Sequence, residues 1–309
     1  MRLRPAFVCS TGGHLTELFL LAPHLEPERF REGLWVTHVG TQREGLLEGR
    51  EVRYLPYMAS RDVHAVLAAV PAAWRILREE QVDVVYSTGA AIALCVLPLA
   101  LLLRKSVVYV ESLARVTDPS LTGRLLALLP GVRLLSQNAP FSRRWEKCVS
   151  VLDRYRSVEV DEPGTVARVL VTVGTARPWK FSRLLRRLID VIPADVEVVW
   201  QIGADEVVRP EGDVRPLMTQ EEFEAELDAA DVVITHGGVG TILTCLSHGT
   251  FPVVAPRLGR FKEHVDDHQL QIARVLRVRD LGLVVDAGEL TWHDVERAAR
   301  RAICSTPPE

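Results

Sequence analysis

The sequence predicts an α/β protein built of two doubly wound domains that face each other across a cleft. Apolar strands alternate with helices in both halves of the chain, a rhythm typical of parallel sheets with helical crossovers. A glycine-rich turn follows a strand in each half, at residues 11–14 and 236–241. A polar stretch at 153–165 separates the halves, so we expect one domain at residues 1–160 and a second at 161–309. Because such sheets bind ligands at the carboxyl ends of their strands, the expected site lies in the cleft.

Short apolar runs predict the strands, and apolar residues at helical spacing predict the helices between them. In the first half, the expected strands are 6–10, 34–38, 82–87, 106–111 and 132–136, and the expected helices are 15–21, 63–80 and 90–103. In the second half, the expected strands are 166–173, 196–202, 231–235, 251–255 and 283–285, and the expected helices are 181–192, 221–230, 242–248 and 269–278.

Composition argues against several classes of protein. The 309 residues are enough for two domains, and a hydrophobic content of 48% supports a large core. The formal net charge of -3 gives no general attraction to nucleic acid, so we expect no nucleic acid partner. Five cysteines without a Cys-x-x-Cys pair favour a reducing compartment and argue against a zinc site. The N-terminal apolar run is too short for a signal peptide, so we expect a cytoplasmic protein.

The glycine-rich turn of the second half predicts an anion site. His236, Gly237 and Gly238 directly follow a buried strand, and Gly240 and Thr241 lead into a helix. Backbone N–H groups at a helix N-terminus attract an anion, and glycines let a phosphate approach the backbone closely. We therefore expect a nucleotide diphosphate at this turn.

The glycine turn of the first half carries an imidazole. His14 follows Gly12 and Gly13 at the start of a helix, and a histidine that titrates near neutrality suits a general base. The alternative is that His14 only caps or lines the turn. Glu17 lies one helical turn further on, where it could orient His14 or contact an acceptor. Its alternative is a solvated first-turn carboxylate that the helix dipole favours.

The motifs of the first half resemble those of a known family. The segment 11–17, Thr-Gly-Gly-His-Leu-Thr-Glu, resembles the opening motif of the membrane-anchoring, acceptor-side subunit of the eukaryotic dolichol-linked GlcNAc transferase. It also resembles bacterial relatives that act on polysaccharide precursors. The segment 111–115, followed by 120–123, resembles the next motif of that subunit.

The second half resembles the donor-binding partner subunit, on segments 171–175, 236–243 and 267–269. The peptidoglycan GlcNAc transferase MurG is a more distant relative. The order of these motifs resembles a fusion of the two subunits, and together they are typical of glycosyltransferase family 28. The resemblance implies two Rossmann-like domains of the GT-B fold.

The resemblance also implies an activity, that of an inverting, metal-independent hexosyltransferase. It would move a sugar from a UDP-sugar, with UDP-GlcNAc as one possibility, to a lipid-linked acceptor in cell-surface polysaccharide synthesis. Residues 1–160 would form the acceptor and membrane side, at the inner face of the plasma membrane, and residues 161–309 the nucleotide-sugar side. No metal and no cofactor are expected. The implied catalytic residues are His14 and Glu17; the acceptor-binding residues are Gly12, Gly13, Glu111 and Arg115; the donor-binding residues are Gly174, Thr175, His236, Gly237, Gly238, Gly240, Thr241, Thr244, Asp267, His268 and Gln269.

One position departs from the family pattern. Family members carry a ribose-binding glutamate on the helix after the glycine turn, where this chain has Thr244. A threonine can form a hydrogen bond but cannot offer a bidentate carboxylate. Either Thr244 takes that role, or Glu263 or Asp267 contributes. The loop 260–269 that holds these two carboxylates has an alternative as a solvated loop, and it lacks the Asp-x-Asp signature of a metal site.

Three alternatives stay open. The apolar helix 90–103 ends in Arg104 and Lys105, and together with the segment 121–135 it suits docking on anionic lipid headgroups. The same helix suits burial against a parallel sheet. A UDP-sugar 2-epimerase shares the two-domain plan, and a non-catalytic nucleotide-sugar-binding subunit fits the Thr244 departure, although a pure binding protein needs no base such as His14.

Overall fold

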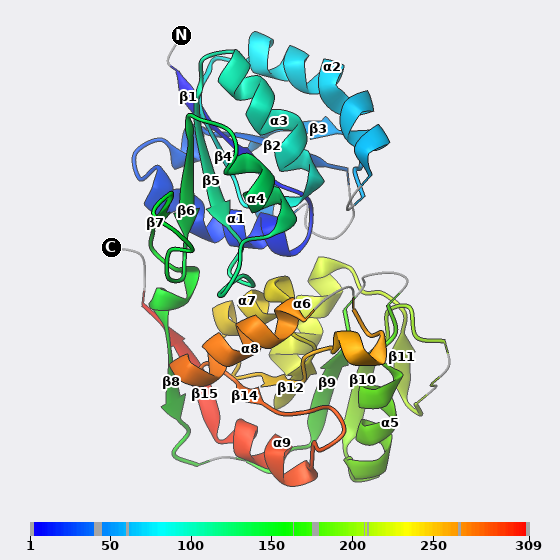
Figure 1. Cartoon of the computed structure of the whole chain (residues 1–309). Helices are drawn as coiled ribbons and strands as arrows, with labels where there is room; N and C mark the ends of the chain where they lie inside the picture. Colours follow the sequence, from blue (N-terminus) through cyan, green and yellow to red (C-terminus); the bar gives the residue numbers. More distant parts are fainter. Residues whose placement is uncertain are drawn as a thin grey trace. The chain divides into compact units, whose positions relative to one another are not determined.

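The computed structural model describes residues 3–39, 45–59, 62–162, 164–174, 179–206, 208, 210–264 and 267–306. The chain divides into two compact units, Met1–Val151 and Leu152–Glu309 (Figure 1). Each unit is a parallel sheet covered by helices, so the prediction of two doubly wound α/β domains is confirmed. The predicted boundary between residues 160 and 161 follows strand β8 (Tyr155–Glu159), which pairs with the C-terminal strand β15 (Arg301–Ser305) in the second unit.

Within the described residues, the first unit holds a seven-stranded sheet in the order β3-β2-β1-β4-β5-β6-β7, and all neighbouring strands in it are parallel. Its strands are β1 (Arg4–Val8), β2 (Leu34–His38), β3 (Glu51–Leu55), β4 (Val82–Ser87), β5 (Ser106–Glu111), β6 (Val132–Ser136) and β7 (Trp145–Lys147). Its helices are α1 (Gly13–Leu25), α2 (Val63–Glu79), α3 (Ala90–Leu102) and α4 (Leu121–Leu126), with 3-10 turns η1 (Phe30–Glu32) and η2 (Gly45–Leu47).

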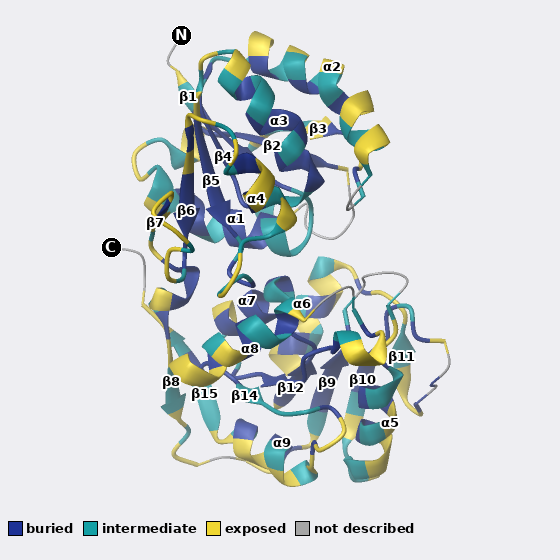
Figure 2. Ribbon diagram, in the orientation of Figure 1, coloured by how far each residue is buried: buried dark blue, intermediate teal, exposed yellow. Residues whose placement is uncertain are grey.

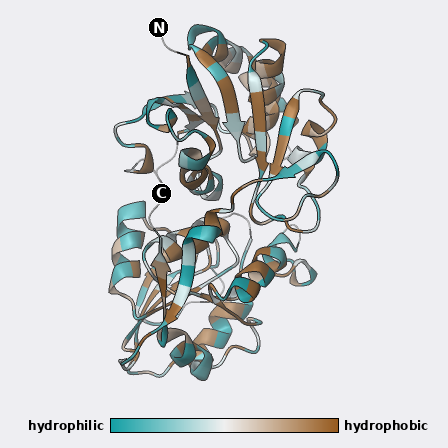
Figure 3. Ribbon diagram, turned by 90° about the vertical axis from the view of Figure 1, so that its left-hand side faces the viewer, coloured by the Kyte–Doolittle hydropathy of each residue, from teal (hydrophilic) through white to brown (hydrophobic). Residues whose placement is uncertain are grey.

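Alternation along the strands gives this sheet two apolar faces. Ala6 and Val8 belong to a core that includes buried residues of α2, α3 and α4. Phe7 points to the other face, where its ring packs 4.9 Å from the ring of Trp35, and Trp35 in turn contacts Phe19 of α1. The sheet is therefore covered on both sides, and its strands are correspondingly hydrophobic and buried (Figures 2 and 3).

In the described part of the second unit, a six-stranded parallel sheet has the order β11-β10-β9-β12-β13-β14, and β8 and β15 form an antiparallel pair. The sheet strands are β9 (Arg168–Thr172), β10 (Glu197–Gln201), β11 (Asp213–Arg215), β12 (Val232–Thr235), β13 (Val253–Val254) and β14 (Leu283–Val284). The helices are α5 (Ser182–Val191), α6 (Gln220–Ala229), α7 (Val239–Ser247), α8 (His268–Arg279) and α9 (Trp292–Ala299), with 3-10 turns η3 (Val151–Arg154) and η4 (Gly259–Phe261).

Seven of the helices that the structure describes begin in one of two ways. At the starts of α2, α4, α6 and α9, the side chains of Asp62, Ser120, Thr219 and Thr291 accept a hydrogen bond from a backbone N–H of the first turn. Helices α1, α3 and α7 instead follow a glycine that offers no capping side chain. Their first N–H groups are therefore not covered by a cap, which suits them to a ligand.

Two predicted helices start later than the observed ones. α1 begins at Gly13 instead of residue 15, and α7 begins at Val239 instead of residue 242. In each case, residues that we expected in the glycine turn form the first turn of the helix. Only Gly12 and Gly238, at the N-cap positions, precede the helices. The strands missed from the sequence (β3, β7, β8, β11 and β15) are short or partly exposed, so they lack a continuous apolar run.

Helix α3 is mainly a core helix. Seven of its residues are buried, and it packs on α2 and on the sheet, while Leu102 at its end is exposed. The burial alternative therefore holds for most of its surface. No helix in the described part of the chain is both long and apolar enough to cross a membrane.

Candidate functional site

The first sheet changes direction between β1 and β4. The strands that follow β1 extend to one side, and those that follow β4 extend to the other, so the two neighbours form the topological switch point. Helix α1 follows β1 through Gly12, and helix α3 follows β4 through Gly89. Both glycines have positive φ angles, 82° and 121°, which other residues rarely adopt. Two glycine-capped helix N-termini therefore meet at one point of this sheet edge.

His14 lies at this point. Its carbonyl oxygen accepts a hydrogen bond from the Thr88 hydroxyl at 3.0 Å. A Cβ atom added to Gly89 would lie 3.3 Å from Cε1 of the His14 ring, so the imidazole packs against the N-terminus of α3. Gly12 and Gly13 form the start of α1 beside it. The predicted catalytic imidazole and the predicted acceptor-side glycines are therefore brought together in the structure.

Glu17 is buried, with no exposed surface. Its Oε1 accepts hydrogen bonds from the Leu113 backbone N–H and from the Gln137 side-chain amide, both at 2.5 Å, and its Oε2 accepts from the Ser112 hydroxyl at 3.0 Å. Burial raises the pKa of Glu17 to about 7, against the opposing effect of these hydrogen bonds. The alternative of a solvated first-turn carboxylate is wrong, because this side chain anchors the loop after β5.

Glu111 is also buried, and burial raises its pKa. One oxygen accepts from the Tyr109 hydroxyl and the Ser112 backbone N–H, and the other from the backbone N–H and hydroxyl of Ser120. A Cβ atom at Gly123 would lie 2.3 Å from Oε2 of Glu111, so this position has room only for glycine. Glu111 thus joins the end of β5 to the start of α4.

Arg115 ends the loop that these two carboxylates hold. Its backbone N–H donates to the Ser112 carbonyl at 2.8 Å, and its own carbonyl accepts from the Asn138 side-chain amide at 3.0 Å. The Arg115 side chain is half-buried. The structure therefore places the acceptor-side motif 111–115 in a rigid turn beside the N-terminus of α1.

In the second unit, His236 packs between two glycine turns. A Cβ atom at Gly174 would lie 2.4 Å from Cε1 of His236, and one at Gly238 would lie 2.4 Å from Nε2 of the same ring. A Cβ atom at Gly203 would lie 2.2 Å from the Gly174 carbonyl oxygen. Three glycines from the ends of three adjacent strands therefore allow close backbone approach at one place. Thr175 lies outside the described residues.

The His236 imidazole is neutral. It is buried, and burial, assisted by the positive charge of Arg257, lowers its pKa to about 3. A neutral ring packed against two glycine turns fixes their shape without adding charge to the site.

Gly238 is the N-cap of α7, and Gly240 and Thr241 lie in its first turn. The opening N–H groups of a helix have no acceptor within the helix, so this end of α7 can bind an anion. Thr244 is buried, and its hydroxyl donates to the Gly240 carbonyl at 2.9 Å. That bond uses the donor that Thr244 would offer to a ribose.

The two carboxylates considered in place of Thr244 are engaged in local contacts. Glu263 is buried, forms a bidentate ion pair with Arg183, and accepts from the Leu258 backbone N–H. Asp267 accepts from the Gly259 backbone N–H at 2.7 Å. Both side chains therefore shape the loop before α8.

The start of α8 lies beside the glycine turn. A Cβ atom at Gly237 would lie 2.7 Å from Cβ of Gln269, and the Gln269 amide oxygen accepts from the Arg257 backbone N–H at 2.9 Å. The His268 ring contacts the His264 ring at 4.6 Å, and His264 stacks on Trp179 at 5.8 Å. The predicted donor residues of α7 and α8 are thus close together. Among the described residues, no group of three His, Cys, Asp or Glu side chains could hold a metal ion.

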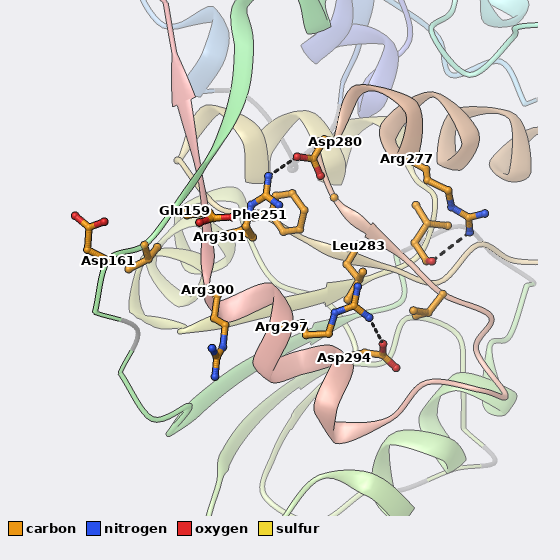
Figure 4. A pocket seen from close by; sticks show the side chains of 14 residues that line it. Glu159, Asp161, Phe251, Arg277, Asp280, Leu283, Asp294, Arg297, Arg300 and Arg301 are labelled. Atoms are coloured by element: carbon orange, nitrogen blue, oxygen red, sulfur yellow. Dashed lines mark hydrogen bonds and ion pairs between the residues drawn. The ribbon is translucent and has the colours of Figure 1, made fainter.

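Two other pockets of this unit have different linings. Figure 4 shows a pocket of about 680 Å³ beside β14 and β15, which contains none of the predicted site residues. Its charged lining consists of Arg277, Arg297, Arg300, Arg301, Glu159, Asp161, Asp280 and Asp294. These formal charges cancel, so the pocket does not favour an anion. Another pocket, of about 320 Å³, lies near the carboxyl ends of β13 and β14 and includes Asp267.

Sequence reasoning missed Arg257 and Gly89. Arg257 comes just after the apolar run 251–255, a position that places it at the carboxyl end of a strand. Gly89 follows the strand β4 in the same way that Gly12 follows β1. The rule that sites lie at strand ends could have found both residues.

Comparisons with known proteins agree with this geometry. A family model described as Glycosyltransferase family 28 C-terminal domain matches residues 168–303, and one described as Oligosaccharide biosynthesis protein Alg14 like matches residues 6–139. The family 28 C-terminal model thus covers the glycine turns of the second unit, and the Alg14-like model covers those of the first unit.

Solved structures share the fold over nearly the whole chain. MurG of Acinetobacter baumannii is 18% identical, with 95% of this chain and 89% of that chain covered and a TM-score of 0.54. The glycosyltransferase SsfS6 of Streptomyces sp. SF2575, solved with thymidine diphosphate, is 20% identical, with 96% and 95% covered and a TM-score of 0.57. The spinosyn forosaminyltransferase SpnP is 15% identical, with 96% and 89% covered and a TM-score of 0.61.

Proposed function

We propose that this protein of the GT-B fold, which matches the glycosyltransferase family 28 C-terminal domain over residues 168–303 and the Alg14-like family over residues 6–139, is an inverting, metal-independent hexosyltransferase that uses a UDP-sugar and a lipid-linked acceptor. The observation that supports this most is the presence of a glycine-capped helix N-terminus at a strand end in each unit, with His14 beside the one in the first unit. Such a protein would act in cell-surface polysaccharide synthesis at the cytoplasmic face of the membrane.

The second unit holds the donor in this proposal. The N-terminus of α7, with Gly238, Gly240 and Thr241, binds the diphosphate, and Gly174 belongs to the turn on the other side of His236. Support for a nucleoside diphosphate comes from the positive end of the α7 dipole and from the absence of a Cβ at Gly174 and Gly238. UDP-GlcNAc is the first donor to test, because the chain resembles GlcNAc transferases.

The first unit holds the acceptor. Its polyprenyl diphosphate would bind at the paired N-termini of α1 and α3, where Gly12 and Gly89 leave the backbone open. Glu17 and Glu111 hold the loop 111–115, so they position Arg115 and do not themselves contact the acceptor.

The reaction is a single displacement. The acceptor oxygen attacks the anomeric carbon, the bond from that carbon to the UDP oxygen breaks, and the His14 imidazole takes the acceptor proton. The leaving UDP gains negative charge, and N–H groups of the α7 turn stabilise it, which is the larger expected contribution to the rate. Base catalysis by His14 adds about 10²–10⁴-fold.

The surface of the first unit supports a membrane-bound acceptor. Leu121, Leu125 and Leu128 are exposed at helical spacing along α4 and the turn after it, with the exposed Arg124 among them. A leucine row with a cation suits insertion at an anionic lipid interface.

The test is a panel of radiolabelled nucleotide sugars offered with bacterial membrane lipid extract and scored by label in the lipid fraction. Transfer from a UDP-sugar is expected, and transfer from no nucleotide sugar would reject the proposal. UDP-GlcNAc incubated without lipid is the matching control, since epimerisation there would favour the UDP-sugar 2-epimerase. Nucleotide binding with no turnover in either arm would indicate the non-catalytic binding subunit.

A further inference from the structure

Arg257 is a buried cation without a partner anion. Its side chain is 1% exposed. Nη2 donates to the Val173 carbonyl at 2.6 Å, whereas Nε is buried and has no hydrogen-bond partner. Within the part of the chain that the structure describes, no carboxylate lies within ion-pair distance of this guanidinium. Arg183, by contrast, contacts both Glu263 and Asp286.

The missing partner is unusual because burial of an isolated charge is costly. Glu263 and Asp205 favour the charged form of Arg257 from a distance, but they form their hydrogen bonds elsewhere, Glu263 with Arg183 and Asp205 with Ser182. Burial lowers the pKa of Arg257 to about 10, so the guanidinium still carries its charge at neutral pH. The folded protein therefore keeps a buried positive charge that none of its described carboxylates contacts directly, although the Phe181 ring lies 5.5 Å from the guanidinium carbon.

That charge lies at the proposed donor-phosphate site. Val173, whose carbonyl binds the guanidinium, immediately precedes Gly174. The backbone N–H of Arg257 binds Gln269, which packs on Gly237. Arg257 thus follows β13 and lies next to the glycine turns at the carboxyl ends of β9 and β12, and these three strands are adjacent in the sheet.

We propose that Arg257 is a positioning residue whose fixed positive charge is matched by the diphosphate of the bound donor. It acts from beneath the turn 173–174, by holding that turn and by its field, and so complements the α7 N-terminus. The inference rests on the proposed function for the identity of the anion. Because the leaving diphosphate gains charge during transfer, the same field stabilises the transition state more than the bound substrate.

The test separates charge from shape with two variants, Arg257→Met and Arg257→Lys. Calorimetry gives the dissociation constants of UDP, uridine and inorganic pyrophosphate for each variant and for the wild type. Arg257→Met should weaken UDP and pyrophosphate by about tenfold or more and uridine by less than about twofold, because only the first two carry the anion. Arg257→Lys should restore most of the UDP affinity.

The melting temperature without ligand is a second readout, because replacing a residue with only a structural role would lower it. Since Arg257→Met removes an unpaired buried charge, its melting temperature should equal or exceed that of the wild type. Equal weakening of uridine and UDP, or unchanged affinity for all three probes, would overturn the inference. If the wild type binds UDP no more tightly than pyrophosphate, that result would count against the proposed nucleotide. The pyrophosphate affinities of the two Arg257 variants would still decide the role of Arg257.

Discussion

The Glu17 carboxylate accepts a hydrogen bond from the Leu113 backbone N–H at 2.5 Å, so a residue of α1 fixes the loop that follows β5. The Gln137 side chain donates to the same oxygen, which ties the end of β6 into the contact. A buried acid thus connects three strand ends of the first sheet, and its protonation state affects the stability of the acceptor half.

The raised pKa of Glu17 predicts how stability depends on pH. The folded-state pKa of about 7 exceeds the ordinary glutamate value of 4.5, so the folded protein binds the proton more tightly than the unfolded chain does. The contribution of Glu17 is therefore fully present below pH 4.5 and is lost as pH rises through 7, by roughly 3 kcal/mol. In Glu17→Gln, which cannot ionise, this loss is absent.

Urea unfolding of wild type and Glu17→Gln between pH 4.5 and 8 measures the effect, because other titrating groups cancel in the difference. The stability advantage of the wild type should shrink as pH rises through this range. A difference between the two proteins that stays constant with pH would show that Glu17 does not titrate there.

The sequence was sufficient for the parts of the site that depend on neighbouring residues. The glycine turns at 11–14 and 236–241 were found because each directly follows an apolar strand. The role of Glu17 could not be found in this way, because its partners Leu113 and Gln137 are 96 and 120 residues away along the chain. The position of Arg257 at a strand end could have been found from the sequence, but its burial against the Val173 carbonyl, 84 residues earlier, could not.

Gly203 should not tolerate a side chain. It has a φ angle of 61°, and a Cβ atom there would lie 2.2 Å from the Gly174 carbonyl oxygen. Gly203→Ala must therefore displace the turn that holds the proposed donor diphosphate, at a cost of about 1–3 kcal/mol in stability. We expect a lower melting temperature and at least a tenfold weaker UDP affinity, which calorimetry measures.

Gly164→Ala is the matched control for that substitution. No atom lies within 4 Å of a Cβ at this position, and its φ is not positive. The control should bind UDP as the wild type does. Unchanged binding by Gly203→Ala as well would show that the Gly174 turn does not contact the donor.

The exposed leucines of the first unit should bind membranes. Leu121 and Leu128 are 56% and 76% exposed, and a charge at either position would oppose insertion among acyl chains. The double variant Leu121→Glu/Leu128→Glu should lose most binding to vesicles that contain anionic lipid, measured by co-sedimentation. Val278→Glu, at a position of the second unit that is 86% exposed, should bind as the wild type does. Equal vesicle binding by all of these proteins would place the membrane contact elsewhere.

His14 should affect the chemical step and leave donor binding intact. His14→Ala removes the base that we assign to the acceptor proton, so kcat should fall by about 10²–10⁴-fold. UDP affinity should stay within about twofold, because the proposed diphosphate site belongs to the second unit. His24→Ala is the control, since His24 is an exposed histidine near the end of the same helix. Transfer assays with saturating donor give the rates, and a His14→Ala protein with the rate of His24→Ala would remove the imidazole from the mechanism.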